Sequence, residues 1–215
     1  MTGERSVTLS FDNGPEPGVT GAVLDVLAAR GAAATFFVIG RKLAAPGARA
    51  LAERARAEGH RVGNHTYSHS VPLGHAGPGA ADREITATQA LLGDLAPERL
   101  FRPYGDQGRL GPHLLSREAR DLLVEGGYTC VLWNALPRDW IDPDGWVDRA
   151  MTQVAGQSHS LIVLHDLPTG AMRHLPAFLD RLEQAGVPVT LDYPADCLAI
   201  VDGRPTDRCA ACVTD

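Results

Sequence analysis

The chain has 215 residues, of which 44 % are apolar and 21 % charged, a composition typical of a globular protein with one sizeable core. Its formal net charge is −6 and no long basic run is present, so we expect no binding of nucleic acid. No apolar run approaches the roughly 20 residues of a membrane span, and the start lacks the features of a signal peptide. We therefore expect a cytoplasmic protein without membrane contact, or a secreted one whose N-terminus has been trimmed.

Strands and helices are expected to alternate along the chain. Residues 6–11 alternate apolar and polar side chains, which predicts a strand that ends at the turn Asn13-Gly14-Pro15. Residues 19–30 follow with apolar side chains at helical spacing. By the same criteria we expect strands at 33–39, 61–64, 99–102, 128–133, 160–164 and 187–191, and helices at 46–58, 81–95, 112–125, 142–154 and 171–185. In the helix at 142–154, Asp142 and Pro143 are expected to form the N-cap and first turn.

The alternation repeats about seven times without a change of composition, which predicts one domain over residues 1–215 with a mostly parallel sheet and helices outside it. A closed barrel and an open doubly wound sheet both fit this pattern. We place the core at about residues 6–192 and a C-terminal tail at 193–215. The tail carries Cys209 and Cys212, an isolated Cys-x-x-Cys that favours an exposed segment over half of a zinc site.

Five polar clusters follow predicted strands, where a parallel α/β barrel gathers its chemistry. They are Asp12-Asn13, His65 with His69, Arg102, Asp139-Trp140 and His165-Asp166. A barrel brings all of these strand ends around one cavity. Scattered surface residues are therefore a poor explanation for the five clusters taken together.

Each cluster alone has a simpler explanation. His65 and His69 would share one face of a helical turn, as a metal needs, but two surface histidines have the same spacing and do not complete a zinc site. Asp12 suits a general base or a metal ligand, although Asp-Asn-Gly-Pro is also ordinary turn chemistry. A lone histidine such as His165 is more often part of the core.

The remaining two clusters are equally open. Arg102 needs a carboxylate partner if it points inward, and is otherwise exposed to solvent. Asp139 next to Trp140 is also explained by a turn beside a core aromatic residue.

Taken in order, the clusters resemble the motifs of the polysaccharide deacetylase family with the NodB-homology domain. The segment Ser10-Phe11-Asp12-Asn13-Gly14-Pro15 is similar to the family's Thr-Phe-Asp-Asp-Gly-Pro, and His65-Thr66-x-x-His69 to its His-Ser/Thr-x-x-His. The segment Arg102-Pro103-Tyr104-Gly105 resembles the family's Arg-Pro-Pro-Tyr-Gly with one proline missing. Asp139-Trp140 is similar to its Asp-Trp motif, and Val163-Leu164-His165 is similar to its final strand, which ends in Leu-x-His. The likeness runs from about Val7 to Leu191 and implies a distorted (β/α)7 barrel.

The resemblance implies a metal-dependent hydrolase that removes N-acetyl, or O-acetyl, groups from an N-acetylated sugar or polysaccharide. The implied cofactor is a divalent metal, zinc first and cobalt, nickel or manganese as alternatives, held by Asn13, His65 and His69. Because Asn13 replaces the family's metal-binding aspartate, we expect this metal to be weakly held.

The family's catalytic roles fall on four residues of this chain. Asp12 would take a proton from the attacking water, and Arg102 would keep Asp12 ionised. His165 would donate a proton to the leaving nitrogen, while Asp139 raises its pKa and fixes its orientation.

The resemblance also implies a substrate pocket. A backbone N–H near Tyr104 would complete the oxyanion site, and Trp140 and Val163 would wall the acetyl methyl group. The chain departs from the family once more at Leu136, where another aspartate is usual.

Two other functions remain open. One is the hydrolysis of another linear or cyclic amide on the same fold. The other is a degenerate barrel that binds carbohydrate without catalysis, which the loss of the anionic ligand at Asn13 would explain. Retention of Asp12, Arg102, Asp139 and His165 argues against the degenerate barrel.

Overall fold

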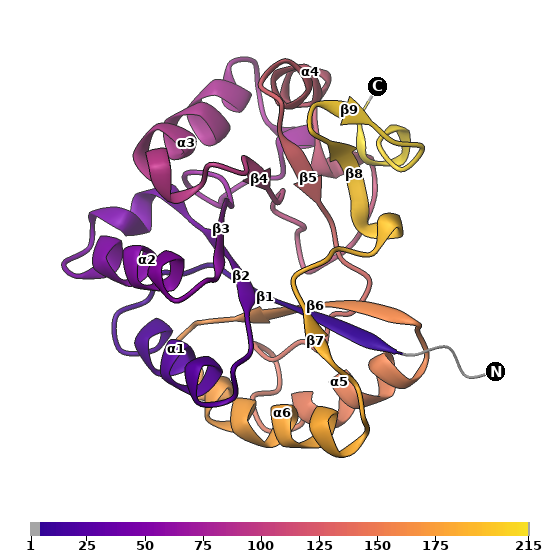
Figure 1. Cartoon of the computed structure of the whole chain (residues 1–215). Helices are drawn as coiled ribbons and strands as arrows, with labels where there is room; N and C mark the ends of the chain where they lie inside the picture. Colours follow the sequence, from indigo (N-terminus) through magenta and orange to yellow (C-terminus); the bar gives the residue numbers. More distant parts are fainter. Residues whose placement is uncertain (1–4, 215) are drawn as a thin grey trace.

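The computed structural model of the chain describes residues 5–214, and within them nine strands form one sheet. The strands are β1 (Ser6–Asp12), β2 (Ala34–Val38), β3 (Arg61–Asn64), β4 (Leu100–Phe101), β5 (Thr129–Val131), β6 (His159–His165), β7 (Val189–Thr190), β8 (Leu198–Val201) and β9 (Arg204–Pro205). The α-helices are α1 (Thr20–Ala29), α2 (Ala48–Ala57), α3 (Ala87–Leu92), α4 (Arg117–Glu125), α5 (Trp146–Ala155) and α6 (Leu175–Gln184). Figure 1 shows the strands around a common centre with the helices outside them.

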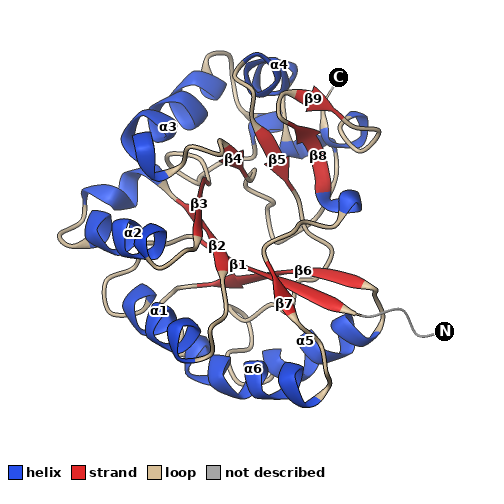
Figure 2. Cartoon of the chain, in the orientation of Figure 1, coloured by secondary structure: helices blue, strands red, loops and turns tan. Residues whose placement is uncertain are grey.

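The strands curl into a barrel in the order β6-β1-β2-β3-β4-β5, and all of these neighbours are parallel. The chain that leaves β5 reaches β6 through a parallel bridge between Ala135 and Ile162, where Val163 N donates to Ala135 O over 3.0 Å. This bridge closes the ring that Figure 2 shows in cross-section. The predicted distorted (β/α)7 barrel is confirmed, and the open doubly wound alternative is excluded.

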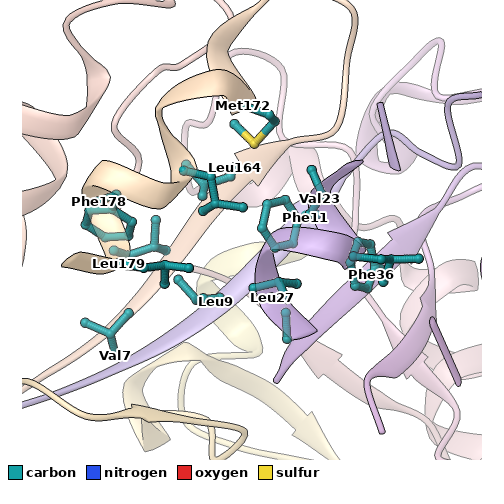
Figure 3. Close-up of a cluster of buried hydrophobic side chains, with 14 of the residues drawn as sticks. Val7, Leu9, Phe11, Val23, Leu27, Phe36, Leu164, Met172, Phe178 and Leu179 are labelled. Atoms are coloured by element: carbon teal, nitrogen blue, oxygen red, sulfur yellow. The ribbon is translucent and has the colours of Figure 1, made fainter. Parts of the chain in front are cut away.

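The alternation in β1 separates a packing face from a polar face. Leu9 and Phe11 point outward into the apolar layer beneath α1 and α6, and the Phe11 ring stacks on Phe36 with centroids 5.1 Å apart. Figure 3 shows this layer. Ser10 and Asp12 consequently face the inside of the barrel, because successive side chains of a strand point to opposite faces. The register of one strand thus places a carboxylate at the mouth of the barrel.

The structure contradicts the expected C-terminal tail over residues 193–214, the part of that range that it describes. β8 pairs antiparallel with β5. Without β8, the backbone N–H and C=O groups along this edge of β5 would be left unpaired. Cys209 and Cys212 are each only 3 % exposed, so they do not lie on the exposed segment that the sequence favours. Both pack in the same apolar cluster as Cys130. Burial raises the pKa of the Cys212 thiol to about 11. The apolar residues of β8 were the signal for this strand.

Some helix boundaries also differ from expectation. The predicted helix 81–95 begins with a π-helical turn, Asp82–Thr86, before α3. The predicted helix 112–125 starts late, because Ser116 caps α4 by accepting a hydrogen bond from Ala119 N. Asp142 is not an N-cap: it accepts from Gly145 N in the turn before α5. Among the helices of residues 5–214, none is long and apolar enough to pass through a membrane.

Candidate active site

A pocket of about 250 Å³ opens where the carboxyl ends of β1, β3, β4 and β6 meet. Its walls include most of the predicted site: Asp12, Asn13, His65, His69, Tyr104, Trp140, Val163 and His165. Arg102 and Asp139 lie behind the wall, both fully buried, and the side chain of each binds one residue of the pocket, Asp12 and His165 respectively. A larger hollow of about 990 Å³ between α3 and α4 contains none of these residues.

Arg102 holds Asp12 in place from inside the barrel. Its Nη1 donates to Asp12 Oδ1 over 2.8 Å and to Ser10 Oγ over 2.6 Å. Its other nitrogens donate to the carbonyl oxygens of Val131 and Leu132. Burial works to raise the pKa of Asp12, but the charge of Arg102, together with the smaller contributions of His65, His165 and the Arg102 hydrogen bond, outweighs burial and holds that pKa below its usual value. Asp12 is therefore a carboxylate at neutral pH.

His65 and His69 lie together, with ring centroids 4.8 Å apart. His65 Nδ1 lies 2.8 Å from Arg102 O, so that Nδ1 carries the proton and Nε2 keeps its lone pair, 3.6 Å from Asp12 Oδ2. Burial lowers the pKa of both rings, that of His69 to about 3, and both imidazoles are neutral at pH 7. Neutral imidazole is the form that binds a metal.

The predicted helical turn between these two histidines is wrong. The segment after β3 is irregular, and Thr66 and His69 have φ values of 65° and 51°, in the left-handed region. The rings meet because this loop folds back on itself. The spacing of four residues predicts that the two rings lie close together, which they do, but on an irregular loop and not on a helical turn.

The side-chain oxygen of Asn13 is buried and has no hydrogen-bond partner among residues 5–214. A buried polar atom without a partner points to a ligand that the protein atoms do not supply. The same part of the chain holds no group of three His, Cys, Asp or Glu side chains that could bind a metal ion. With the amide oxygen of Asn13 added, the candidate donor set becomes two neutral imidazoles and one neutral oxygen. These donors are compatible with zinc and with other divalent transition metals.

His165 is bound to both oxygens of one carboxylate. Asp139 Oδ1 lies 2.9 Å from His165 Nδ1, and Asp139 Oδ2 accepts from His165 N over 2.9 Å. Burial works to lower the pKa of His165, but the hydrogen bond and charge of Asp139 outweigh it, and the pKa is raised. Nδ1 is engaged, so Nε2 is the nitrogen available for proton transfer. The rings of Trp140 and His165 form an edge-to-face contact, with ring centroids 4.6 Å apart.

The pocket also has walls that the sequence patterns did not identify, chiefly Trp133, Leu136 and Leu167. Trp133 Nε1 donates to Gly108 O over 3.0 Å, and a Cβ on Gly108 would lie 1.9 Å from Leu136. These two side chains thus support the loop after Tyr104. The position of Trp133 at the end of a predicted strand was a signal for this role. The Tyr104 ring lies against that of His69, with ring centroids 4.1 Å apart and the ring planes tilted by 45°.

The fold is an α/β barrel whose pocket brings together two titratable groups, Asp12 and His165, each bound to a buried charged side chain. Residues 1–130 match the family model of the polysaccharide deacetylases. The chitooligosaccharide deacetylase of Bradyrhizobium sp. (strain ANU 289) is 35 % identical over 180 residues, which are 80 % of this chain and 76 % of that protein. The peptidoglycan-N-acetylglucosamine deacetylase of Bacillus cereus is 31 % identical over 195 residues, 85 % of this chain and 68 % of that protein.

Among solved structures, the family 4 carbohydrate esterase from Streptomyces lividans in complex with acetate is similar at a TM-score of 0.74 and 27 % identity. The match covers 93 % of this chain and 98 % of that one. The chain therefore belongs to the polysaccharide deacetylase family. The prediction of an enzyme of the sugar N-deacetylase class is confirmed.

Proposed function

We propose that this chain hydrolyses the N-acetyl group of an N-acetylglucosamine unit in an oligosaccharide or polysaccharide, with Asp12 as the base and His165 as the acid. One observation carries the proposal. Two titratable groups line one pocket, and each is bound to a charged side chain behind the wall: Asp12 to Arg102 over 2.8 Å and His165 to Asp139 over 2.9 Å. These contacts displace the pKa of Asp12 downward and that of His165 upward. Such a pair provides an ionised base and a protonated acid at the same pH.

The steps assigned to this chain's own residues follow from their partners. The Asp12 carboxylate accepts the proton of the attacking water, and Arg102 keeps that carboxylate ionised and oriented. His165 Nε2 donates a proton to the leaving sugar nitrogen, while Asp139 holds the ring by Nδ1. The apolar side chains of Trp140 and Val163 surround the acetyl methyl group and limit the access of other water.

His65, His69 and Asn13 would hold a divalent metal, zinc first, with cobalt, nickel or manganese as alternatives. When bound there, such an ion polarises the acetyl carbonyl and makes water more acidic. The two imidazoles and the amide are all neutral, so they leave the charge of the ion uncompensated. We expect the metal to be more easily removed than from a site with a carboxylate ligand.

The substrate class is supported by the relatives, which are named for activity on chitooligosaccharides and on N-acetylglucosamine of peptidoglycan. The pocket, at about 250 Å³, lies just below the roughly 300–1,000 Å³ of sites for drug-sized ligands. This size suits a single acetylated sugar unit, with the rest of the chain outside. Two alternatives remain, hydrolysis of another amide and binding of carbohydrate without catalysis.

Acetate release from N-acetylglucosamine oligomers, with and without a chelator, separates these functions. We expect release that stops with chelator and returns with zinc. Binding of oligomers without acetate would support the non-catalytic alternative, and cleavage of other amides without acetate release would support the other hydrolase. Equal release with and without chelator would contradict the metal-dependent mechanism.

The variant His165→Ala tests the assignment of the acid. We expect kcat to fall by about 10²–10⁴, the usual contribution of general acid catalysis, while metal content stays the same. Loss of metal from this variant would mean that His165 is a ligand and not the acid.

A further inference from the structure

Glu84 holds the loop that carries the two pocket histidines, although it belongs to none of the predicted site clusters. Its Oε2 accepts hydrogen bonds from Tyr67 N over 2.9 Å and from Ser68 N over 2.8 Å. Its Oε1 accepts from Ser68 Oγ over 2.6 Å. One carboxylate thus binds both backbone N–H groups at the centre of the loop between His65 and His69.

This loop has a conformation that needs support from outside. Thr66 and His69 both have positive φ values, which residues with a Cβ adopt only when the surroundings impose them. Within the loop region, Asn64 Oδ1 accepts from Thr66 N and Thr66 Oγ1 accepts from His69 N. The N–H groups of Tyr67 and Ser68 are bound by a distant segment instead, at Glu84.

Glu84 is itself anchored. It lies in the π-helical turn Asp82–Thr86, where its carbonyl oxygen accepts from Thr88 Oγ1 over 2.9 Å. The next residue, Ile85, accepts from Asn64 Nδ2 over 2.9 Å, which ties the turn to the end of β3. The turn and the histidine loop are therefore joined at two points, one through Asn64 and one through Glu84.

We propose that Glu84 is a positioning residue that presets the loop from His65 to His69, so that the affinity for a divalent metal depends on the reach of its carboxylate. The effect on metal rests on the proposed function, whereas the effect on the loop does not. Without the hydrogen bonds of Glu84 to Tyr67 and Ser68, which we call the clamp, the loop samples more conformations. Part of the free energy of metal binding is then spent on ordering the loop, which lowers the affinity. The role is one of distance and hydrogen bonding, and not of charge.

Three substitutions separate reach from charge. Glu84→Gln keeps the length and a carbonyl acceptor for the two N–H groups but removes the charge. Glu84→Asp keeps the charge but is one methylene shorter, so it does not reach the loop. Glu84→Ala removes both. The matched control is Glu118→Ala, because the Glu118 carboxylate also accepts from a loop N–H, that of Gly79, away from the histidines.

Two measurements are made on each variant of the 215-residue chain. Competition with a chromophoric chelator gives the affinity for zinc, and hydrogen exchange of the metal-free protein gives the protection of the Tyr67 and Ser68 amides. We expect Glu84→Asp and Glu84→Ala to weaken zinc binding by about 10–100-fold, as is usual for groups that orient metal ligands, and to lose amide protection. Glu84→Gln and Glu118→Ala should match the wild type in both.

The outcomes are distinct. Wild-type zinc affinity in Glu84→Asp together with weak binding in Glu84→Gln would show an effect of charge and overturn the proposal. Unchanged exchange at Tyr67 and Ser68 in Glu84→Ala would overturn the clamp itself. If Glu84→Ala does not fold, the comparison of the Asp and Gln variants decides. A wild-type protein that binds no zinc would contradict the proposed metal, and the exchange measurement would still test the clamp.

Discussion

Arg102 and Asp12 form an ion pair inside the barrel, with 2.8 Å between Nη1 and Oδ1 and almost no solvent exposure for either side chain. A buried charge without its partner is strongly unfavourable, because the interior cannot solvate it. The pair therefore links two properties of the protein, the ionisation of the proposed base and the stability of the fold. A substitution at Asp12 cannot alter one without the other.

The first prediction concerns Asp12→Asn. We expect turnover to be abolished and the free energy of unfolding to fall by about 3–5 kcal/mol, since Arg102 is left as an uncompensated charge. Activity and urea denaturation measure the two effects. As a control, Asp25→Asn breaks an exposed pair with Arg54 and should lower the free energy of unfolding far less, because solvent screens exposed pairs. A wild-type rate in Asp12→Asn would show that Asp12 serves the turn alone.

The second prediction concerns the proton on His165. Its pKa is raised because the hydrogen bond and charge of Asp139 outweigh burial, so the protonated acid persists to higher pH. Asp139→Asn removes the charge and should move the alkaline limb of the kcat/KM profile to lower pH, with a lower maximal rate. An NMR titration of the His165 ring checks the same shift directly. An alkaline limb that stays in place would assign it to another group.

The third prediction is a pH dependence of stability from Asp166. This side chain is fully buried, accepts from Thr20 Oγ1, and has one oxygen without a partner among residues 5–214. Burial raises its pKa from 3.8 to about 7. Between these two values the folded protein binds more protons than the unfolded one, so the contribution of Asp166 to stability is lost as pH rises through this window.

Asp166→Asn removes this titration while keeping an oxygen for Thr20. The variant should gain stability relative to the wild type from about pH 4 to pH 7, and the difference should be constant above that range. Thermal unfolding of both proteins across the range measures it. A difference that does not change with pH would mean that Asp166 keeps the same charge in both states.

The barrel and the grouping of the pocket residues followed from two sequence signals. The alternation in β1 places Asp12 on the inner face, and the alternation of strands with helices implies parallel strands whose carboxyl ends meet. Together these signals bring Asp12, His65 and His165 to one pocket. The buried contacts of Asp12 with Arg102 and of His165 with Asp139 then set the charge states of these two residues against the effect of burial, and burial itself keeps His65 neutral. No local sequence pattern contains these contacts.

Other parts of the site depend on contacts between distant segments. The loop from His65 to His69, with its left-handed φ values, is held by Asn64 and Glu84 and by the backbone N–H groups of Gly40 and Arg41. Glu84 is 15 residues beyond His69 in the chain. The wall residue Leu136 becomes part of the pocket because the loop at Gly108 packs on it. Residue spacing predicts neither contact, that of Glu84 with the histidine loop nor that of Leu136 with the loop at Gly108, because nothing in the local sequence of either partner marks it.

The last prediction concerns Asn13, the position at which this chain departs from the family's metal-binding aspartate. Its φ of 77° lies in the left-handed region, which aspartate and asparagine both tolerate, so Asn13→Asp should leave the turn intact. We expect tighter zinc binding and greater resistance to chelator, because the carboxylate adds a charge-assisted contact to two neutral imidazoles. Asn13→Ala, which removes the oxygen, should weaken binding.

The same substitution should have the opposite effect on the metal-free protein. A second carboxylate beside buried Asp12 adds like-charge repulsion, so Asn13→Asp should lower Tm without metal and increase the rise in Tm on adding zinc. Zinc titration and thermal unfolding with and without the ion measure both effects. If Asn13, its Asp variant and its Ala variant bind zinc equally, the buried oxygen is no ligand. The site would then consist of His65 and His69 completed by water, or would hold no functional metal.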